Sequence, residues 1–417
     1  MQNEIERLIN DKASPDEIRL SGNIVIDVNR DGSITMGHTC VKGVINIMRP
    51  NIVIDGSNAK IEVNVNDCTT SDRSLFFIHP VARNVQFRNM NVRVKIDNDA
   101  NSSRTFSLIY NTAYGLKIDN CNLEMISYRQ INMMGIYNNG NLDTHMDTRS
   151  DNLVISNSTI RTECYADYGQ DRACAVYGVY NYLANSVTVQ NTYVYVMNRG
   201  ENESHKAIGV YTNGRFGRFV GNNIKANGTH NRGLLKERAH AYGFVNYGLH
   251  TIITSNNIIG EWGGKCIGLD NNGEYAIIDC NKILSTHTIC GRSVCSRANN
   301  SVIRGNVFTS TSRNARLIEH SADNCIICGN FMEVLMVPLE CRSGCGIYAT
   351  ETCRNNIISE NIIRNVLDCG IFADKTVGVI HNNMVVSYPE TIAQADGKNA
   401  MLKLKLNEEM IQSIITE

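Results

Sequence analysis

The sequence predicts an all-β fold, a single parallel β-helix (solenoid) of about 11–13 coils with short terminal caps. Three observations support this prediction. An apolar column recurs along the chain, and a second apolar column follows it five residues later. Successive units lie 22 to 25 residues apart where the spacing is tightest and 30 to 37 apart elsewhere, a period at which one coil cannot bury its own apolar face. Within each unit, apolar and polar residues alternate with the period of a strand.

The two apolar columns define the strands of each coil. The first column is Phe87, Ile118, Ile155, Val189, Phe219, Ile253, Ile278, Ile303, Ile327, Ile358 and Ile380, and the second is Val92, Leu123, Ile160, Val194, Ile224, Ile258, Ile283, Phe308, Met332, Ile363 and Val385. Two residues after the first column the chain usually has Asn, Gly, Ser or Cys, as at Asn89, Asn120, Asn157, Asn191, Gly221, Cys280 and Gly305. Asn and Gly suit the αL conformation of a tight corner. We therefore expect both columns to stack in the interior, with a bend between them.

Composition and the chain ends fit one elongated body. The sequence has five prolines and no Ser/Gly/Pro-rich linker, so we divide it into an amino-terminal cap (1–20), the β-helix (21–388) and a carboxy-terminal strand and helix cap (389–417). A formal net charge of −1 gives no reason to expect nucleic acid or a membrane as partner. The segment MQNEIERLIN lacks the features of a signal peptide, and no run reaches membrane-spanning length, so we expect a cytoplasmic protein.

The fifteen cysteines fit reduced thiols better than disulfides, because their number is odd and no export signal is recognised. Cys325 and Cys328 form a CxxC, but in the strand frame their side chains point to opposite faces. We interpret the cysteines as small core residues, and we expect no metal and no cofactor.

A further column predicts an outward-facing stripe. It contains His79, Tyr110, Tyr137, Tyr180, Tyr211, Val245, Asp270, Cys295, Glu319, Tyr348 and Phe372, each preceded by an apolar residue that we place inside. Two residues earlier stand glycines, which we expect on the same outer face, at Gly135, Gly178, Gly209, Gly243, Gly268, Gly346 and Gly370. A floor of glycines beside tyrosines suits sugar rings, which need a flat apolar surface with hydroxyl groups at hand. The alternative is a tyrosine ladder covered by a loop or by another subunit.

Charged residues near this stripe are the candidates for chemistry. Asp270 and Glu319 lie two coils apart, so their backbones are about 9 to 10 Å apart, which suits an inverting pair of carboxyl groups. Arg297 and His320 lie close enough to tune them. We expect the loop before Val245, with Lys236, Arg238 and His240, to form a wall beside this stripe. The alternative is that the two acids are ordinary surface residues.

Glu261 and Trp262, the only tryptophan, are a second candidate pair, because the indole face can stack on a sugar. No GxxxxGK[ST], GxGxxG, GxSxG or HExxH motif occurs in a suitable context. Nucleotide binding, acyl transfer by an elbow serine and zinc hydrolysis are therefore not supported.

The coil pattern resembles the pectate-lyase-like superfamily of right-handed β-helices over roughly residues 20–388. The NTD, DD, GHG and RIK motifs of polygalacturonases, the DPHD of alginate epimerases, and the calcium aspartates and RxPxxR of pectate lyases are absent, so calcium is not implied. A looser resemblance, to the inulin fructotransferase and difructose anhydride hydrolase family, rests on the segment from Asn256 to Gly263 followed by Cys266 and Ile267. It implies a catalytic role for Glu261, but the aspartate expected eleven residues earlier is replaced by His250.

Two classes of function follow. The first is a carbohydrate-active enzyme, a glycoside hydrolase or polysaccharide lyase, that cleaves or rearranges an oligo- or polysaccharide. Hydrolysis, elimination and intramolecular transfer remain open. The second is a non-catalytic glycan-binding or structural β-helix, such as a segment of a phage tail spike. The resemblance also suggests a homotrimer.

Overall fold

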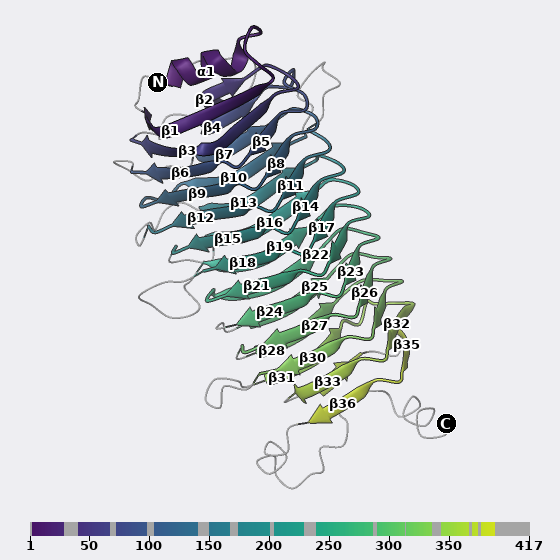
Figure 1. The fold of residues 1–417 in the computed structure, drawn as a ribbon. Coiled ribbons are helices and arrows are strands. Elements are labelled where there is room, and N and C mark those ends of the chain that lie inside the picture. Colours follow the sequence, from purple (N-terminus) through teal and green to yellow (C-terminus); the bar gives the residue numbers. More distant parts are fainter. Residues whose placement is uncertain are drawn as a thin grey trace, which may run out of the picture.

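The computed structural model describes residues 2–28, 41–66, 72–97, 104–140, 150–166, 174–200, 204–228, 239–286, 290–312, 314–335, 343–366, 369–373 and 377–387. Within these ranges the chain forms an elongated stack of parallel coils, with helix α1 (Gln2–Asn10) at the amino-terminal end (Figure 1). Ile5 and Ile9 of α1 are buried, and the Asn10 amide donates to the Asn46 carbonyl at 2.7 Å. The helix therefore covers the first coil. The predicted carboxy-terminal cap, 389–417, lies outside the described residues.

The strands form two parallel sheets. The 24-stranded sheet, here sheet A, starts with β1 (Glu17–Val28) and β3 (Val53–Val65) and continues with two strands from each coil. The first of these two are β5 (Gln86–Arg88), β8 (Lys117–Asp119), β11 (Val154–Ser156), β14 (Thr188–Gln190), β17 (Arg218–Val220), β20 (Ile252–Thr254), β23 (Ile277–Asp279), β26 (Val302–Arg304), β29 (Ile326–Cys328), β32 (Asn356–Ser359) and β35 (Gly378–His381). The second are β6 (Asn91–Ile96), β9 (Asn122–Ser127), β12 (Thr159–Cys164), β15 (Tyr193–Asn198), β18 (Asn223–Asn227), β21 (Asn257–Glu261), β24 (Lys282–Thr286), β27 (Val307–Ser310), β30 (Phe331–Val334), β33 (Ile362–Val366) and β36 (Met384–Ser387).

The 12-stranded sheet, here sheet B, takes one strand from each coil. Its strands are β2 (Val41–Ile47), β4 (Asp72–Ile78), β7 (Thr105–Asn111), β10 (Asn132–Asn139), β13 (Ala175–Tyr182), β16 (Lys206–Asn213), β19 (His240–Asn246), β22 (Lys265–Asn271), β25 (Cys290–Ser296), β28 (Asn314–His320), β31 (Ser343–Ala349) and β34 (Cys369–Phe372). Three parallel strands per coil confirm the predicted all-β solenoid.

Both predicted interior columns are confirmed. Ile253 pairs with Ile278 and Ile278 with Ile303 on adjacent coils, and all three side chains have no exposed surface. The second column stacks in the same way, from Val92 and Leu123 to Phe308 and Met332. Burying one such side chain contributes roughly 1.5–3 kcal/mol, and the stack repeats this gain at every coil.

The bend after the first column has the predicted left-handed conformation. Asn89, Asn120, Asn157, Asn191 and Cys280 have φ between 49° and 55°, and Gly221 and Gly305 have φ of 66° and 61°. A residue that tolerates positive φ is needed here because the chain must turn within two residues.

An internal asparagine ladder, which the sequence pattern did not reveal to us, lines this bend. Its members stand three residues after the first apolar column and are Asn222, Asn256, Asn281, Asn306, Asn330, Asn361 and Asn383. The Asn281 amide nitrogen donates to Asn306 Oδ1 at 3.0 Å and to the Ile253 carbonyl at 2.8 Å. The ladder thus satisfies backbone groups that the bend removes from strand pairing.

Two predictions about the outer stripe are wrong. The glycines do not form an outer floor: Gly243 and the next residue, Phe244, are both buried, and a Cβ on Gly243 would lie 2.5 Å from Ile258 Cγ2. The inward–outward alternation of side chains breaks at this glycine because the backbone of sheet B lies too close to the second apolar column to leave room for a side chain between them. The second wrong prediction is the start of the stripe. In the first coils, Phe77 rather than His79 pairs with Tyr110.

Candidate functional site

The outward stripe of sheet B is continuous from coil to coil. Strand register places its members side by side in the order Phe77, Tyr110, Tyr137, Tyr180, Tyr211, Val245, Asp270, Cys295, Glu319, Tyr348 and Phe372. Apart from the first member, this is the column that the sequence predicts.

The amino-terminal half of the stripe is a tyrosine column, which we define as Phe77, Tyr110, Tyr137, Tyr180 and Tyr211. Tyr180 and Tyr211 stack with ring centroids 4.7 Å apart and an interplanar angle of 17°. Burial raises the pKa of Tyr211 to about 12, so its hydroxyl stays protonated at neutral pH. Phe77 and Tyr110 are buried, whereas Tyr137, Tyr180 and Tyr211 are half-buried, so the accessible part of the column consists of these three tyrosines with their hydroxyl groups.

Further aromatic rings widen this column. The ring centroid of Tyr177 lies 4.7 Å from that of Tyr180, and the ring centroid of Tyr182 lies 6.2 Å from that of Tyr180 in a stacked arrangement. Tyr247 lies 5.8 Å from Tyr211 and is 47% exposed, so part of the surface is open to a ligand.

The stripe then changes to a charged cluster, which we define as Asp270, Arg292, Arg297, Arg316 and Glu319. Asp270 accepts a hydrogen bond from the Arg297 guanidinium and one from Asn272 Nδ2 at 3.1 Å. Asp270 is 7% exposed, which makes its pairing with Arg297 necessary for a buried charge. Arg297, predicted as a tuning residue, does contact this carboxylate.

Glu319 binds two arginines that the sequence reading did not include. It accepts hydrogen bonds from Arg292 Nε and from Arg316 Nη1, the latter at 2.9 Å. Burial raises the pKa of the Glu319 carboxyl, but the two guanidinium groups outweigh burial and the net pKa is lowered. The Arg316 guanidinium also lies 3.7 Å from the centroid of the Tyr348 ring. Glu319 is therefore a rigidly held carboxylate that is ionised at neutral pH.

Cys295 separates the two carboxylates. It pairs with Asp270 on one side and with Glu319 on the other, so the acids are two coils, about 9.6 Å, apart along the stack. Burial, aided by the charge of Asp270, raises the pKa of Cys295 to about 12. The same two causes raise the pKa of Tyr242 to about 12. Both groups are neutral at physiological pH, and the Tyr242 hydroxyl is a proton donor.

The other predicted site residues do not all lie on the outer face of sheet B. His240 is partly exposed on the outward side of β19, 6.3 Å from the Tyr242 ring, whereas Lys236 and Arg238 lie outside the described residues. His320 has no exposed surface and follows Ser296 in an interior column, so it does not reach the outer face. Its predicted role beside Glu319 is wrong because adjacent strand residues point to opposite faces.

Glu261 and Trp262 lie on sheet A, away from this stripe. Glu261 pairs with Lys225 at 2.7 Å and accepts from Asn227 Nδ2 at 2.9 Å. Trp262, with φ of 58°, is 38% exposed at the end of β21. The same sheet holds Glu163, a 1% exposed carboxylate bound by Tyr165 at 2.6 Å, which the sequence reading did not single out.

The described residues were compared with the requirements of a metal cluster and of a membrane-spanning helix. They contain no group of three or more His, Cys, Asp or Glu side chains placed to hold a metal ion together. Cys325 is buried and Cys328 is partly exposed, on opposite sides of β29 as predicted. Most other cysteines in these ranges are buried thiols, but Cys280 is exposed, so it is not a core residue. No helix in the described ranges has the length and apolar character needed to cross a membrane.

Comparisons with known proteins establish the fold. No protein-family model matches the sequence, and no curated protein sequence matches it. The A-module of the mannuronan C-5 epimerase AlgE6 of Azotobacter vinelandii superposes with a TM-score of 0.51 at 12% identity, covering 89% of this chain and 91% of the module. PfbA, a surface adhesin of Streptococcus pneumoniae, gives 0.47 at 12% identity over 89% and 82% of the two chains. DFA-IIIase from Arthrobacter chlorophenolicus A6 gives 0.45 at 10% identity over 91% and 87%. The shared fold is a right-handed parallel β-helix.

Proposed function

We propose that the protein is a carbohydrate-active enzyme that binds an oligo- or polysaccharide along the outer face of sheet B and cleaves or rearranges a glycosidic bond there. The observation that carries the proposal is the continuity of the stripe, in which the tyrosine column is followed on neighbouring coils by the charged cluster. A chain of sugar rings laid along the coils would contact aromatic faces first and carboxylates next. The epimerase that shares this fold is named for mannuronan, a polysaccharide.

In the hydrolytic form of this proposal, Glu319 is the general base, because its arginine partners keep it ionised. It accepts a proton from water, the water oxygen attacks the anomeric carbon, and the glycosidic oxygen leaves with a proton from the Tyr242 hydroxyl, while the Asp270 carboxylate faces the developing positive charge. In the eliminating form, Glu319 or His240 takes the proton next to a uronate carboxylate whose charge Arg297 neutralises. A C=C bond forms as the C–O bond to the leaving sugar breaks, and the leaving oxygen takes a proton from the Tyr242 hydroxyl or from water. Both forms need the acidic and the basic groups on one face.

The test is a screen of oligosaccharides, fructans and uronides with two readouts, reducing ends and absorbance at 235 nm. Reducing ends without absorbance indicate hydrolysis, and growth of the absorbance indicates elimination. The Glu319→Gln protein serves as control, because it keeps the shape of the site but loses the base. If no carbohydrate in the panel gives either signal while some of them bind, the enzymatic form of the proposal fails.

A second candidate function is glycan binding without catalysis. The pairing of both carboxylates with arginines favours it, because such pairs lower the tendency of either acid to give or take a proton. Binding measured by calorimetry in the absence of product formation over a day would support this candidate instead.

A further inference from the structure

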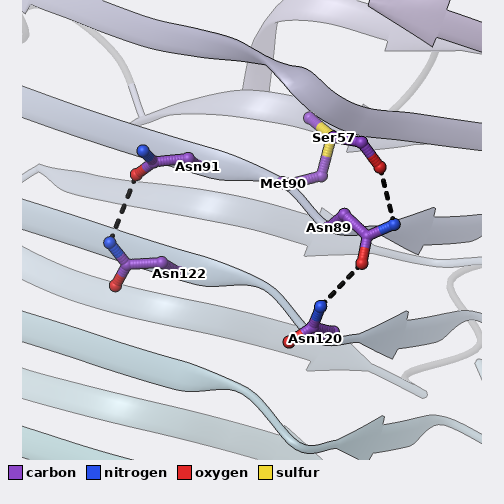
Figure 2. A pocket seen from close by; sticks show the side chains of 6 residues that line it. All are labelled: Ser57, Asn89, Met90, Asn91, Asn120 and Asn122. Atoms are coloured by element: carbon purple, nitrogen blue, oxygen red, sulfur yellow. Dashed lines mark hydrogen bonds between the residues drawn. The ribbon is translucent and has the colours of Figure 1, made fainter.

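Side chains at equivalent positions of neighbouring coils lie close enough in this fold to contact each other. Figure 2 shows this in a shallow pocket on the outer side of the early coils. There Asn120 Nδ2 donates to Asn89 Oδ1 at 2.7 Å, and Asn122 Nδ2 donates to Asn91 Oδ1 at 3.2 Å. The contact follows from the spacing of parallel strands, about 4.8 Å. Where two such positions both hold cysteine, the same spacing brings two thiols together.

Cys345 and Cys369 form such a pair. They are in register on the neighbouring strands β31 and β34, and their Sγ atoms lie 2.9 Å apart. Neighbouring strands are about 4.7–4.9 Å apart, which falls within the Cα separation of about 4.4–6.8 Å that a disulfide spans. The two sulfur atoms can therefore reach the bonding distance of about 2.05 Å while the strands keep their register.

The pair lies on the outer face of sheet B, beside the charged cluster. Cys345 is in register with Arg316 of the preceding coil, and the charge of the Arg316 guanidinium acts on its thiol. The hydrogen bond with Cys369, and then burial, raise the pKa of Cys345, so this thiol is protonated at neutral pH. Cys345 is buried, whereas Cys369 is partly exposed. A small oxidant in solution therefore reaches Cys369 first.

A second pair of neighbouring thiols, Cys164 and Cys174, is built differently. Their side chains are 0% and 2% exposed, so neither meets solvent. Cys164 Sγ donates to the Arg129 carbonyl at 3.5 Å, and Cys174 Sγ donates to the Ile131 carbonyl at 2.6 Å. The hydrogen bond with Cys164, and then burial, raise the pKa of Cys174. Buried, protonated thiols are inert, so this pair is an internal comparison for the first.

We propose that Cys345 and Cys369 are an oxidation site, at which a disulfide forms and fastens β34 to β31. With a peroxide as oxidant, the sulfur of Cys369 attacks one peroxide oxygen, the O–O bond breaks, and a sulfenic acid and one water form. The sulfur of Cys345 then attacks the sulfur of Cys369, the S–O bond breaks, and a second water leaves with the Cys345 proton. The two thiols lose two electrons, and the peroxide gains them. This inference does not depend on the proposed function.

The disulfide fastens the end of sheet B. Among the described residues, β34 is the last strand of this sheet, and it pairs with β31 at three positions. A strand at the end of a stack opens more easily than a central one. The link joins residues 24 apart in the chain, so it also restricts the ways in which the segment between them can open. It holds the stacked rings of Tyr348 and Phe372, whose centroids are 4.9 Å apart, beside Arg316.

The test is treatment of the reduced full chain with a small excess of hydrogen peroxide, followed by alkylation of the remaining thiols in denaturant and peptide mass spectrometry. We expect a linked peptide that contains Cys345 and Cys369 and has lost the mass of two hydrogen atoms. Cys164 and Cys174 should remain free for alkylation. The link should slow amide hydrogen exchange in β34 about tenfold, and dithiothreitol should reverse both changes. Exchange in β25, in the middle of sheet B, should be the same in both states.

The variant Cys369→Ser separates this site from general oxidation of the protein. It should form no link and show no slowing in β34. The matched control, Cys280→Ser, removes an exposed thiol on the outer side of sheet A and should behave like the wild type. If Cys369→Ser does not fold, the wild type before and after dithiothreitol provides the comparison. Oxidation without the Cys345–Cys369 link, including the case in which Cys369 only reaches a sulfinic acid, overturns the proposal. A link that leaves exchange in β34 unchanged overturns its role as a fastening.

Discussion

The inside and the outside of the same three coils differ in how much their chemistry varies. Inside, the first column reads Ile253, Ile278 and Ile303, and all three are fully buried. Outside, the stripe of sheet B reads Asp270, Cys295 and Glu319 on the corresponding coils. The repeated interior lets the coils stack, because each isoleucine packs against the equivalent isoleucine of the next coil. Variation outside gives each coil a separate chemistry, which a binding or catalytic site requires.

The largest effect should come from breaking the interior. Ile278→Asp places an unpaired charge in the middle of the stack, and we expect the protein to lose cooperative folding, with a cost above about 4 kcal/mol. Ile277→Asp is the matched control, because this neighbouring side chain points outward and is 37% exposed. Thermal unfolding followed by circular dichroism compares the two. Equal stabilities would show that the interior assignment is wrong.

Neutralising either acid of the charged cluster should strongly lower catalytic turnover and leave the fold intact. Asp270→Asn and Glu319→Gln should each lower turnover by about 10²–10⁴, because the first removes the negative charge that faces the reacting carbon and the second removes the base. Their melting temperatures should stay within a few degrees of the wild type. Asp279→Asn, on the outer side of sheet A, is the control and should keep the full rate. Near-normal rates in both amide variants would make Glu261 the next candidate.

Breaking the asparagine ladder should cost stability without affecting chemistry. Asn306→Leu leaves the Ile278 carbonyl and the Asn281 backbone N–H without their present partners, so we expect a loss of about 1–3 kcal/mol. Asn257→Leu, at an amide on the outer side of β21, should change stability by less than about 0.5 kcal/mol. Denaturant titration measures both. A tolerated Asn306→Leu would mean that water replaces the amide.

A smaller effect is expected in the tyrosine column. Tyr211→Ala removes one ring that stacks on Tyr180, and we expect substrate binding to weaken by about 1–2 kcal/mol, or roughly tenfold, with little change in turnover. Tyr193→Ala, on the outer side of sheet A, should bind like the wild type. Calorimetry on the substrate found by screening decides between them, and equal affinities would place the ligand elsewhere.

The smallest expected effect is on pH dependence. Arg292 and Arg316 hold the pKa of Glu319 below its ordinary value of 4.5, so its stabilising contribution is complete above that pH and is lost as the pH falls through the lowered pKa. Activity that needs ionised Glu319 should therefore persist down to pH 4.5 and fall only below it. Arg316→Gln should move the acid limb upward. An acid limb near pH 6 in the wild type would exclude Glu319 as the base.

The interior could be predicted from sequence because two apolar residues recur in every coil at a constant offset of five residues. The outward stripe could also be predicted, since each of its members follows an interior residue. Arg292 and Arg316 could not, because two consecutive buried residues, Ser293 and Val294 in β25 and Leu317 and Ile318 in β28, break the alternation before the stripe, as Gly243 and Phe244 do in β19. This break brings the residue three positions before the stripe to the outer face. The same break misplaced the glycines.

The central claim, that a carbohydrate binds to the outer face of sheet B, is tested most directly by a crystal structure of Glu319→Gln protein soaked with the substrate identified by screening. The substitution should preserve the ligand by preventing turnover. We predict sugar rings lying along β13 to β28, in contact with Tyr180, Tyr211 and Arg297 and with the bond to be cleaved near Asp270. Sugar density beside Glu261 and Trp262 on sheet A, with none on sheet B, would contradict the account.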